Sequence, residues 1–173
     1  MAIREILRLG HPKLYEVSTV VQEDELSDLA AVIEDLRDTL IDFREKHGMG
    51  RAIAAPQIGV MKRLIYIQID EPMVIYNPVL FQKSKQMMTL WDDCMSFPDL
   101  LVKVRRHRSC KMTYRDDHWN KKSIELEGAL SELIQHENDH LYGILAVSRA
   151  VDEKSFCLRS EFKKHYSGGL AEG

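Results

Sequence analysis

The sequence has few of the features that mark membrane, secreted or nucleic-acid-binding proteins. No apolar run approaches the roughly 18 residues that a membrane-spanning helix needs. The first residues, Met1–Glu5, lack the apolar stretch of a secretory signal. The formal net charge of the 173 residues is only −3, which gives no overall attraction to DNA or to an anionic membrane. We therefore expect a cytoplasmic protein with no membrane partner and no DNA partner.

Cysteine is also sparse. The three cysteines are Cys94, Cys110 and Cys157, and so small and odd a number argues against a disulfide scaffold. A free cysteine in a reducing compartment is usually a small core residue. We interpret Cys110 and Cys157 in this way, whereas the neighbours of Cys94 point to a second role.

The composition is that of a globular protein, with 45% hydrophobic and 29% charged residues. The length suits one domain with one core. We predict a single domain over residues 1–173, in which the small and polar residues 167–173 form a frayed tail.

Residues 26–47 carry the clearest helical period. Gly48 and Gly50 follow, and glycine commonly ends a helix. The segment predicts a helix that packs one face on the core. The apolar positions, at steps of three and four, are Leu26, Leu29, Ile33, Leu36, Leu40 and Phe43.

Other segments are rich in β-branched and aromatic residues and predict strands. We expect the second of these strands to stop at Asn77-Pro78, and residues 116–120 to join the last two. Further helices are predicted at 129–142 and 152–166. The fold class is therefore α+β, with antiparallel strands packed around the helix at 129–142 and with an N-terminal and a C-terminal helix. The predicted strands are 64–69, 74–76, 100–105, 110–114 and 123–126.

The most informative motif is His136-Glu137-Asn138-Asp139-His140. On a helix, positions i and i+4 share one face, so both histidines can bind the same metal ion. Glu137 directly follows the first histidine and, in such motifs, acts on the metal-bound water. Asp139 could accept the second N–H of a ligating imidazole, which would fix its tautomer, or it could equally be a surface charge. The motif predicts a metal site with Glu137 as general acid and base.

Two histidines do not complete a catalytic metal site, which commonly has three protein ligands and one open position. One candidate for the third ligand is Glu161, because related metallopeptidases use a downstream glutamate. The other candidate is Cys94, within the segment 91–98. Spacing alone leaves both candidates open.

Three segments, in the right order, resemble the signature motifs of peptide deformylases. Gly50–Gln57 resembles G-x-G-x-A-A-x-Q, Asp92–Ser96 resembles E-G-C-L-S, and Gln135–Gly143 resembles Q-H-E-x-D-H-L-x-G. The segment Leu7–Leu14 is also similar to the opening of this family. The likeness covers residues 5 to 150, and three spaced motifs are far more specific than any one of them.

The resemblance implies a metal-dependent hydrolase that removes the formyl group from the N-terminal formyl-methionine of new peptides and releases formate. It implies one divalent ion per chain, bound by Cys94, His136 and His140. In this family the ion is Fe²⁺, and a thiolate–imidazole site also suits Zn²⁺, Ni²⁺ or Co²⁺. The expected partners are formylated nascent peptides.

The resemblance also implies the roles of three other residues. Glu137 would take a proton from the attacking water and pass it to the leaving amine. The side-chain amide of Gln57 and the backbone N–H of Met95 would stabilise the negative charge that develops on the formyl oxygen.

The sequence departs from the family pattern at two places. Ala52 replaces the second glycine of the first motif, and Asp92-Asp93 replaces Glu-Gly in the second. Because the family binds the peptide backbone there as an added strand, we expect Gly50, Arg51, Ala52 and Asp93 to contact substrate. We also expect Ala52 and Asp93 to weaken that contact.

Two basic segments have no assigned role. They are residues 103–108, and Arg159, Lys163, Lys164 and His165 on the last predicted helix. Such a run is usually a solvated strand or helix face, and the alternative is a contact with the ribosome, where the expected substrate emerges.

Two other functions stay open on the sequence. One is an H-E-x-x-H metallopeptidase with Glu161 as third ligand. The other is a deformylase-like protein that binds metal but has no turnover. Formate release from a formylated peptide separates the deformylase from both.

Overall fold

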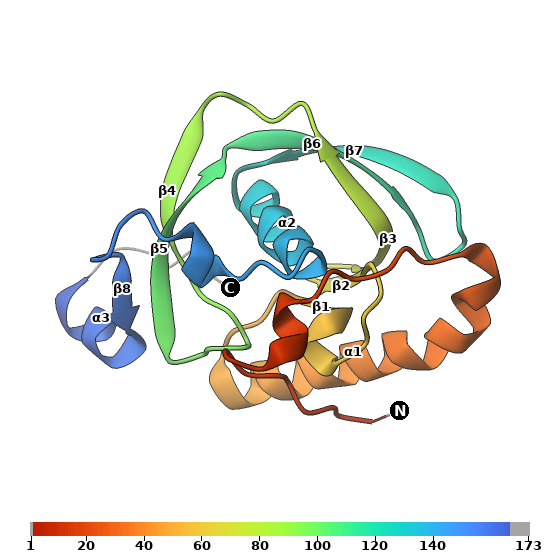
Figure 1. Ribbon diagram of the computed structural model, residues 1–173, viewed down its shortest axis with the longest axis horizontal. Coiled ribbons are helices and arrows are strands. Elements are labelled where there is room, and N and C mark those ends of the chain that lie inside the picture. The colour runs from red at the N-terminus through yellow and green to blue at the C-terminus, as the bar shows by residue number, and fades with distance from the viewer. Residues whose placement is uncertain (1, 167–173) are drawn as a thin grey trace.

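A computed structural model describes residues 2–166 as two antiparallel sheets around a helix. In Figure 1 this helix, α2 (Gly128–Leu141), lies in the middle and the strands surround it. The larger sheet has the order β1 (Ala52–Ala54), β2 (Leu64–Gln68), β3 (Pro72–Phe81), β6 (Ser109–Arg115) and β7 (Lys121–Glu127). The smaller sheet has the order β4 (Met87–Asp92), β5 (Leu100–His107) and β8 (Phe156–Leu158).

Helix α2 is buried along most of its length because it packs against both sheets. Its apolar residues Leu133, Ile134 and Leu141 join a core cluster with the larger sheet, which includes Ile65 and Met112. Because α2 is buried, its polar side chains need hydrogen-bond partners. These polar side chains and their partners form the site described below. The predicted α+β fold with antiparallel strands around this helix is confirmed.

Helix α1 (Leu26–His47) crosses the outside of the larger sheet, next to β1 and β2 (Figure 1). It has the predicted bounds. Its apolar stripe faces the core, where Leu29, Leu36, Leu40 and Phe43 are buried. The helix supports β1 from below, and β1 leads into one wall of the site.

The prediction that the strand at 74–76 stops at Asn77-Pro78 is wrong. Strand β3 continues to Phe81, with a register shift between Tyr76 and Val79. Asn77 has a φ of 52°, and its side chain exchanges two hydrogen bonds with the backbone of Val21. The bulge accommodates the proline, which has no N–H for the ladder, because the residue before it leaves the strand conformation.

The prediction of one helix over 152–166 is also wrong. Residues 156–158 form β8, which pairs with Leu100–Val102, and only Arg159–His165 form a helix, α3. Ahead of β8, the side chain of Asp152 accepts hydrogen bonds from Lys154 and Ser155, so this segment is a turn. Residues 156–158 pair with the edge of β5, and this pairing outweighs their local preference for a helix. The predicted frayed tail, 167–173, lies outside the described residues.

Two strands were not predicted at all. β1 has three residues, all buried, so it shows no alternation. In β4, five of the six residues from Met87 to Asp92 are at least partly buried, and only Thr89 is exposed. This strand therefore also lacks the alternation of apolar and polar residues that marks a strand in the sequence. The other predicted strands and the 116–120 turn are confirmed to within two residues at each end.

The end of α2 is anchored by a close backbone approach. Gly143 has a φ of 71°, and a Cβ there would lie 2.4 Å from the carbonyl oxygen of Tyr15. Ser18 N–H then donates to the carbonyl of Leu141 at 2.9 Å. Only glycine satisfies both the conformation and the space, so the N-terminal segment holds the C-terminal end of α2 in place.

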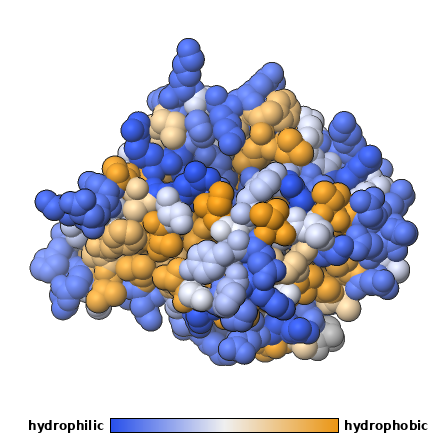
Figure 2. Space-filling model, viewed as in Figure 1, coloured by the Kyte–Doolittle hydropathy of each residue, from blue (hydrophilic) through white to orange (hydrophobic). Residues whose placement is uncertain are grey.

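The surface in the view of Figure 1 is mixed in polarity. Figure 2 shows hydrophobic side chains gathered at the left, over β5 and β8, and hydrophilic side chains over most of the remaining face. Val151, Phe156 and Leu158 are large exposed apolar residues in this part of the chain. None of the helices over residues 2–166 is long and apolar enough to cross a membrane.

Candidate metal centre

Helix α2 places two imidazole rings one turn apart. His136 and His140 lie on the same side of the helix, with ring centroids 5.0 Å apart. Both side chains are buried. The Nε2 atom of His140 lies 3.4 Å from Sγ of Cys94, so this side of the helix points at the cysteine.

Cys94 reaches this point from the turn that follows β4. Its carbonyl accepts the N–H of Phe97 at 3.0 Å, which closes the turn. The backbone N–H of Ser96 points at its Sγ at 3.5 Å. Cysteine binds metal ions as the thiolate.

The three side chains form a group that fits a transition-metal ion. The ligand atoms of Cys94, His136 and His140 all lie within 4.8 Å of one another, and all three residues are buried. One sulfur and two nitrogen donors suit iron, cobalt, nickel or zinc and disfavour magnesium and calcium. Three protein ligands also leave a position for water or substrate, as catalytic sites require.

Asp92 orients the first histidine. Its Oδ2 accepts from Nδ1 of His136 at 3.0 Å, which leaves Nε2 of that ring for an ion. Arg106 donates to the same carboxylate at 2.8 Å and to Asp139 at 3.0 Å. The expectation that Asp139 accepts an imidazole N–H is therefore wrong. Asp139 instead accepts from Arg106 at 3.0 Å and from Arg149 at 2.8 Å.

The charges around the two histidines make them unequal. Burial acts to raise the pKa of Asp92, but His136 and Arg106 hold this pKa well below its usual value. Burial acts to lower the pKa of His136, whereas Asp92 and Cys94 raise it well above the usual value. Burial and the neighbouring His136 lower the pKa of His140. Of the two rings, His140 therefore favours the neutral form that binds a metal.

Glu137 presents a carboxyl oxygen to the site. Its Oε2 is buried and has no hydrogen-bond partner within residues 2–166. Burial raises the pKa of Glu137 to about 7, with His136 acting in the opposite direction. A carboxyl group with a pKa near neutrality can both accept and release a proton.

Gln57 faces the same place from the turn after β1. Its Oε1 accepts the N–H of Ala54 at 2.9 Å, which fixes the amide orientation. Its Nε2 then points at Sγ of Cys94, 3.7 Å away, and at Oγ of Ser96, 3.2 Å away. Met95 directly follows Cys94 and lines the same cavity. The predicted oxyanion-stabilising residues therefore lie beside the ligand group.

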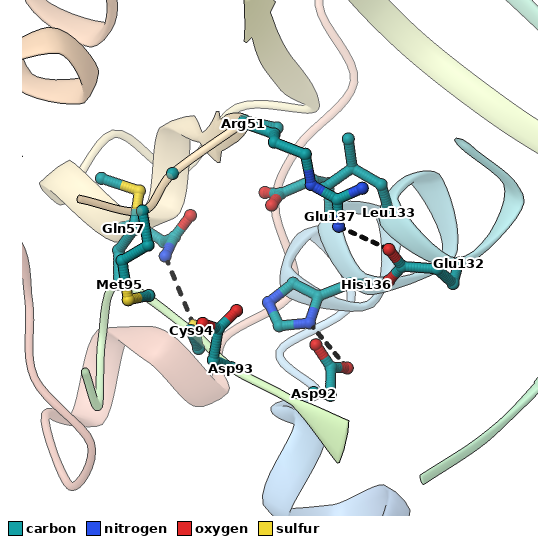
Figure 3. Close-up of a pocket in the computed structure, with 13 residues that line it drawn as sticks. Arg51, Gln57, Asp92, Asp93, Cys94, Met95, Glu132, Leu133, His136 and Glu137 are labelled. Atoms are coloured by element: carbon teal, nitrogen blue, oxygen red, sulfur yellow. Dashed lines mark hydrogen bonds and ion pairs between the residues drawn. The ribbon is translucent and has the colours of Figure 1, made fainter. Parts of the chain in front are cut away.

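These side chains surround a cavity of about 20 Å³, which is enough for roughly one water molecule. Figure 3 shows Gln57 and Cys94 on one side of it, Arg51 and Glu132 on the other, and His136 between them. The cavity is thus bounded by Gln57 and Cys94 on one side and by the Arg51–Glu132 ion pair on the other.

Comparison with known proteins bears on this arrangement. A family model described as polypeptide deformylase matches residues 3–156. The chain belongs to the polypeptide deformylase family. A peptide deformylase of Leptospira biflexa is 32% identical over 170 residues, which covers 90% of this chain and 92% of the relative. Peptide deformylase 1 of Prochlorococcus marinus is 35% identical over 177 residues, which covers 94% and 88%.

Solved deformylases share the fold. The crystal structure of the Thermotoga maritima peptide deformylase superposes with a TM-score of 0.81 at 26% identity, covering 88% of this chain and all of that chain. The Legionella pneumophila peptide deformylase gives a TM-score of 0.80 at 31% identity, covering 94% and 92%. Members of the family are metal-dependent enzymes that remove the N-formyl group from new peptides.

The departures from the deformylase motifs, Ala52, Asp92 and Asp93, line the cavity. Ala52 is buried at the start of β1, and Gly50 has a φ of 120°, with Leu40 Cδ1 only 3.2 Å from where a Cβ would lie. Asp93 does not stand alone, because Arg159 of α3 donates to its Oδ2 at 2.7 Å. Burial raises the pKa of Asp93 and Arg159 opposes this. The carboxylate of Asp93, which we expect to weaken the contact with the peptide, is therefore part of an ion pair.

Glu161 lies away from this site. It is an exposed residue of α3, and its carboxylate pairs with Lys164 at 2.7 Å and with His165 at 3.4 Å. The only group within residues 2–166 that could hold a metal ion is the one that contains Cys94. The structure thus favours Cys94 over Glu161, the two candidates that spacing had left open.

Three residues of the site were missed from the sequence: Arg106, Glu132 and Arg159. Arg106 belongs to the basic run interpreted as solvated, yet it is only 4% exposed. Its alternation with Arg105 and His107 along a strand was the available signal, because every second side chain of a strand faces the core. Glu132 lies four residues before His136 on the predicted helix, so its position on the same face was available from the sequence. Its partner Arg51, and the pairing of Arg159 with Asp93, had no such signal, because these partners lie far apart in the sequence.

Proposed function

We propose that Cys94, His136 and His140 hold the ion with which this deformylase removes the N-formyl group from peptides, and that Glu137 moves the proton. The observation that carries the proposal is the buried Oε2 of Glu137, which has no partner in the described part of the chain and lies beside the ligand group. A buried carboxyl oxygen without a partner is unfavourable unless the site uses it.

The reaction adds water to the formyl carbon and breaks the bond between this carbon and the amide nitrogen. The bound ion would polarise the formyl oxygen and lower the pKa of water. Glu137 accepts the proton that the attacking water loses and delivers it to the departing nitrogen, so the products are formate and a free amine. Nε2 of Gln57 and the backbone N–H of Met95 donate to the oxygen on which negative charge develops, and one such donor typically lowers the barrier by about 3–4 kcal/mol.

The peptide would bind along the open edge of β1. This strand stands at one end of the sheet order β1-β2-β3-β6-β7, so one of its edges has no neighbouring strand in the described chain. A wider groove of about 570 Å³ continues from the small cavity, and Gly50, Arg51 and Asp93 line both. An extended peptide can add to such an edge through its backbone.

Fe²⁺ is the ion we propose for the working enzyme, with Zn²⁺, Ni²⁺ and Co²⁺ as ions that the same donors accept. We also propose that the enzyme acts in the cytoplasm on peptides that leave the ribosome. The exposed basic residue Lys163 of α3 supports a ribosome contact, since it lines the groove.

Formate release from formyl-Met-Ala-Ser, measured anaerobically with the iron-loaded protein, tests the proposal. Wild-type protein should release formate, and the Gln57→Ala variant should release it at a rate about 100-fold or more lower, because one oxyanion donor is lost. Lys111→Ala, on an exposed face of β6, is the matched control and should behave as wild type. Absence of formate with full metal content would refute the proposal.

A further inference from the structure

One wall of the cavity is an ion pair that joins two elements. Nη2 of Arg51, from the segment before β1, lies 2.5 Å from Oε1 of Glu132 on α2 (Figure 3). The two side chains are only 17% and 4% exposed. An apolar side chain placed against a buried pair of this kind displaces water from both charges and offers them no hydrogen bond in return.

The pair has unused hydrogen-bonding capacity. Nε of Arg51 is buried and has no hydrogen-bond partner among residues 2–166. A buried donor of this kind is unfavourable, and an acceptor atom on a ligand removes the penalty. On the other side of the pair, the Glu132 carboxylate can accept from a ligand N–H as well as from Arg51.

A bound substrate must meet this wall. If the formyl group lies between Gln57 and Glu137, the first residue of the peptide begins beside the ligand group, in a cavity of about 20 Å³. Its side chain would then extend along the remaining lining, which includes Arg51 and Glu132 together with the apolar Met49 and Leu133. A carboxamide group satisfies both: its oxygen can accept from Arg51 and its N–H can donate to Glu132.

A negatively charged side chain would not fit as well. Besides Glu132, the cavity is lined by Asp92, Asp93 and Glu137, and the two aspartates are already paired, with Arg106 and Arg159. A carboxylate beside the pair would be repelled by Glu132, and it would have no proton to donate to Glu132. The wall therefore matches a polar but uncharged group.

We propose that the Arg51–Glu132 pair determines specificity for the first residue and makes this deformylase favour N-formyl peptides with an unbranched, polar, uncharged side chain there, over those with methionine. Glutamine is the natural side chain of this class with nearly the length and shape of methionine. The inference rests on the proposed function, since it concerns the substrate of the same site.

Three peptides test the preference in wild-type protein: formyl-Gln-Ala-Ser, formyl-Met-Ala-Ser and formyl-Glu-Ala-Ser. Formate release should give a kcat/KM for glutamine about five- to ten-fold above that for methionine, the ratio that one net hydrogen bond produces. Glutamate should be the poorest of the three. The difference between glutamine and methionine should lie mainly in KM, because the wall contacts the side chain in the ground state as well as in the transition state.

Two variants assign the preference to the pair. Arg51→Leu/Glu132→Leu replaces both charges with apolar groups and should reverse the preference in favour of methionine at unchanged metal content. Glu132→Gln removes one charge at nearly constant shape and should raise the relative rate on the glutamate peptide, which gives an answer even if the double variant fails to fold. Glu25→Leu/Lys62→Leu removes an ion pair far from the cavity and should leave all three ratios as in wild type.

The possible failures are distinguishable. Formate release with methionine preferred ten-fold in wild type, or with ratios unchanged in the Arg51 and Glu132 variants, overturns this inference and leaves the proposed function standing. Absence of formate from all three peptides, with metal bound, overturns the proposed function and this inference with it.

Discussion

Asp92 and Asp93 are consecutive, both are buried, and both are paired with arginine, yet they serve opposite sides of the site. Asp92 turns toward α2, where it contacts His136 and Arg106. Asp93 turns toward the groove, where Arg159 of α3 holds it. The side chains of consecutive residues point in opposite directions along an extended segment, so the end of β4 divides the ligand side from the substrate side.

The two sides differ in how firmly their charges are held. On the ligand side, Arg106 is almost fully buried and bridges Asp92 to Asp139, which Arg149 also contacts. On the substrate side, Arg159 comes from a short helix near the end of the described chain and is partly exposed. A buried multi-partner network fixes geometry, whereas partly exposed pairs can adjust. We infer that substitutions on the ligand side change metal binding and chemistry, and that those on the substrate side change affinity for the peptide.

The largest effect should follow from removal of the sulfur ligand. Cys94→Ser replaces the thiolate with a poor ligand, so both metal content and formate release should be almost abolished. Metal analysis by mass spectrometry, together with formate release, checks this. Glu161→Ala is the control and should leave both values unchanged. The reverse pattern would make Glu161 the third ligand and would break the distinction between the two sides.

The next effect should come from the proton carrier. Glu137→Gln keeps the shape but cannot take up the proton, so kcat should fall at least ~100-fold while metal and fold are retained. Steady-state kinetics with metal analysis and circular dichroism measure the three quantities. A kcat near the wild-type value would show that Glu137 is only structural.

Asp92 and Asp93 provide the direct comparison. Asp92→Asn weakens the orientation of His136, and metal affinity should fall about 10- to 100-fold, as for other residues that orient a ligand. Asp93→Asn should leave metal affinity unchanged, because its partner is Arg159. Competition with a chromophoric chelator measures both affinities. Equal losses in the two variants would contradict the separation of the two sides.

The smallest effect should be at Ala52, where the methyl group stands in place of the glycine of the family motif. Ala52→Gly should lower KM for formylated peptides about five-fold at nearly unchanged kcat, because a backbone contact is worth about 1 kcal/mol in both ground and transition states. The same peptide series measures both constants. A rise in kcat at constant KM would instead place the effect of Ala52 on the geometry of Gln57.

The sequence predicted the elements whose signal is local. The stripe in residues 26–47 gave α1, because a 3.6-residue period needs no knowledge of the neighbours. It could not predict β8, because Phe156–Leu158 form a strand only where the edge of β5 is available. It also could not predict that β3 passes Pro78, because the bulge depends on the hydrogen bonds between Asn77 and Val21.

The same division holds at the site. The sequence by itself determined that His136 and His140 share a helix face with Glu137 beside them, since these residues lie within two turns of one helix. Only the tertiary structure decided which charges meet. Asp92 and His136 are 44 positions apart, and Arg51 and Glu132 are 81 positions apart. Pairing over such distances depends on how the sheets close around α2, which no local pattern encodes. The metal-binding motif on α2 could therefore be predicted from the sequence, whereas the ion pair between Arg51 and Glu132 could not.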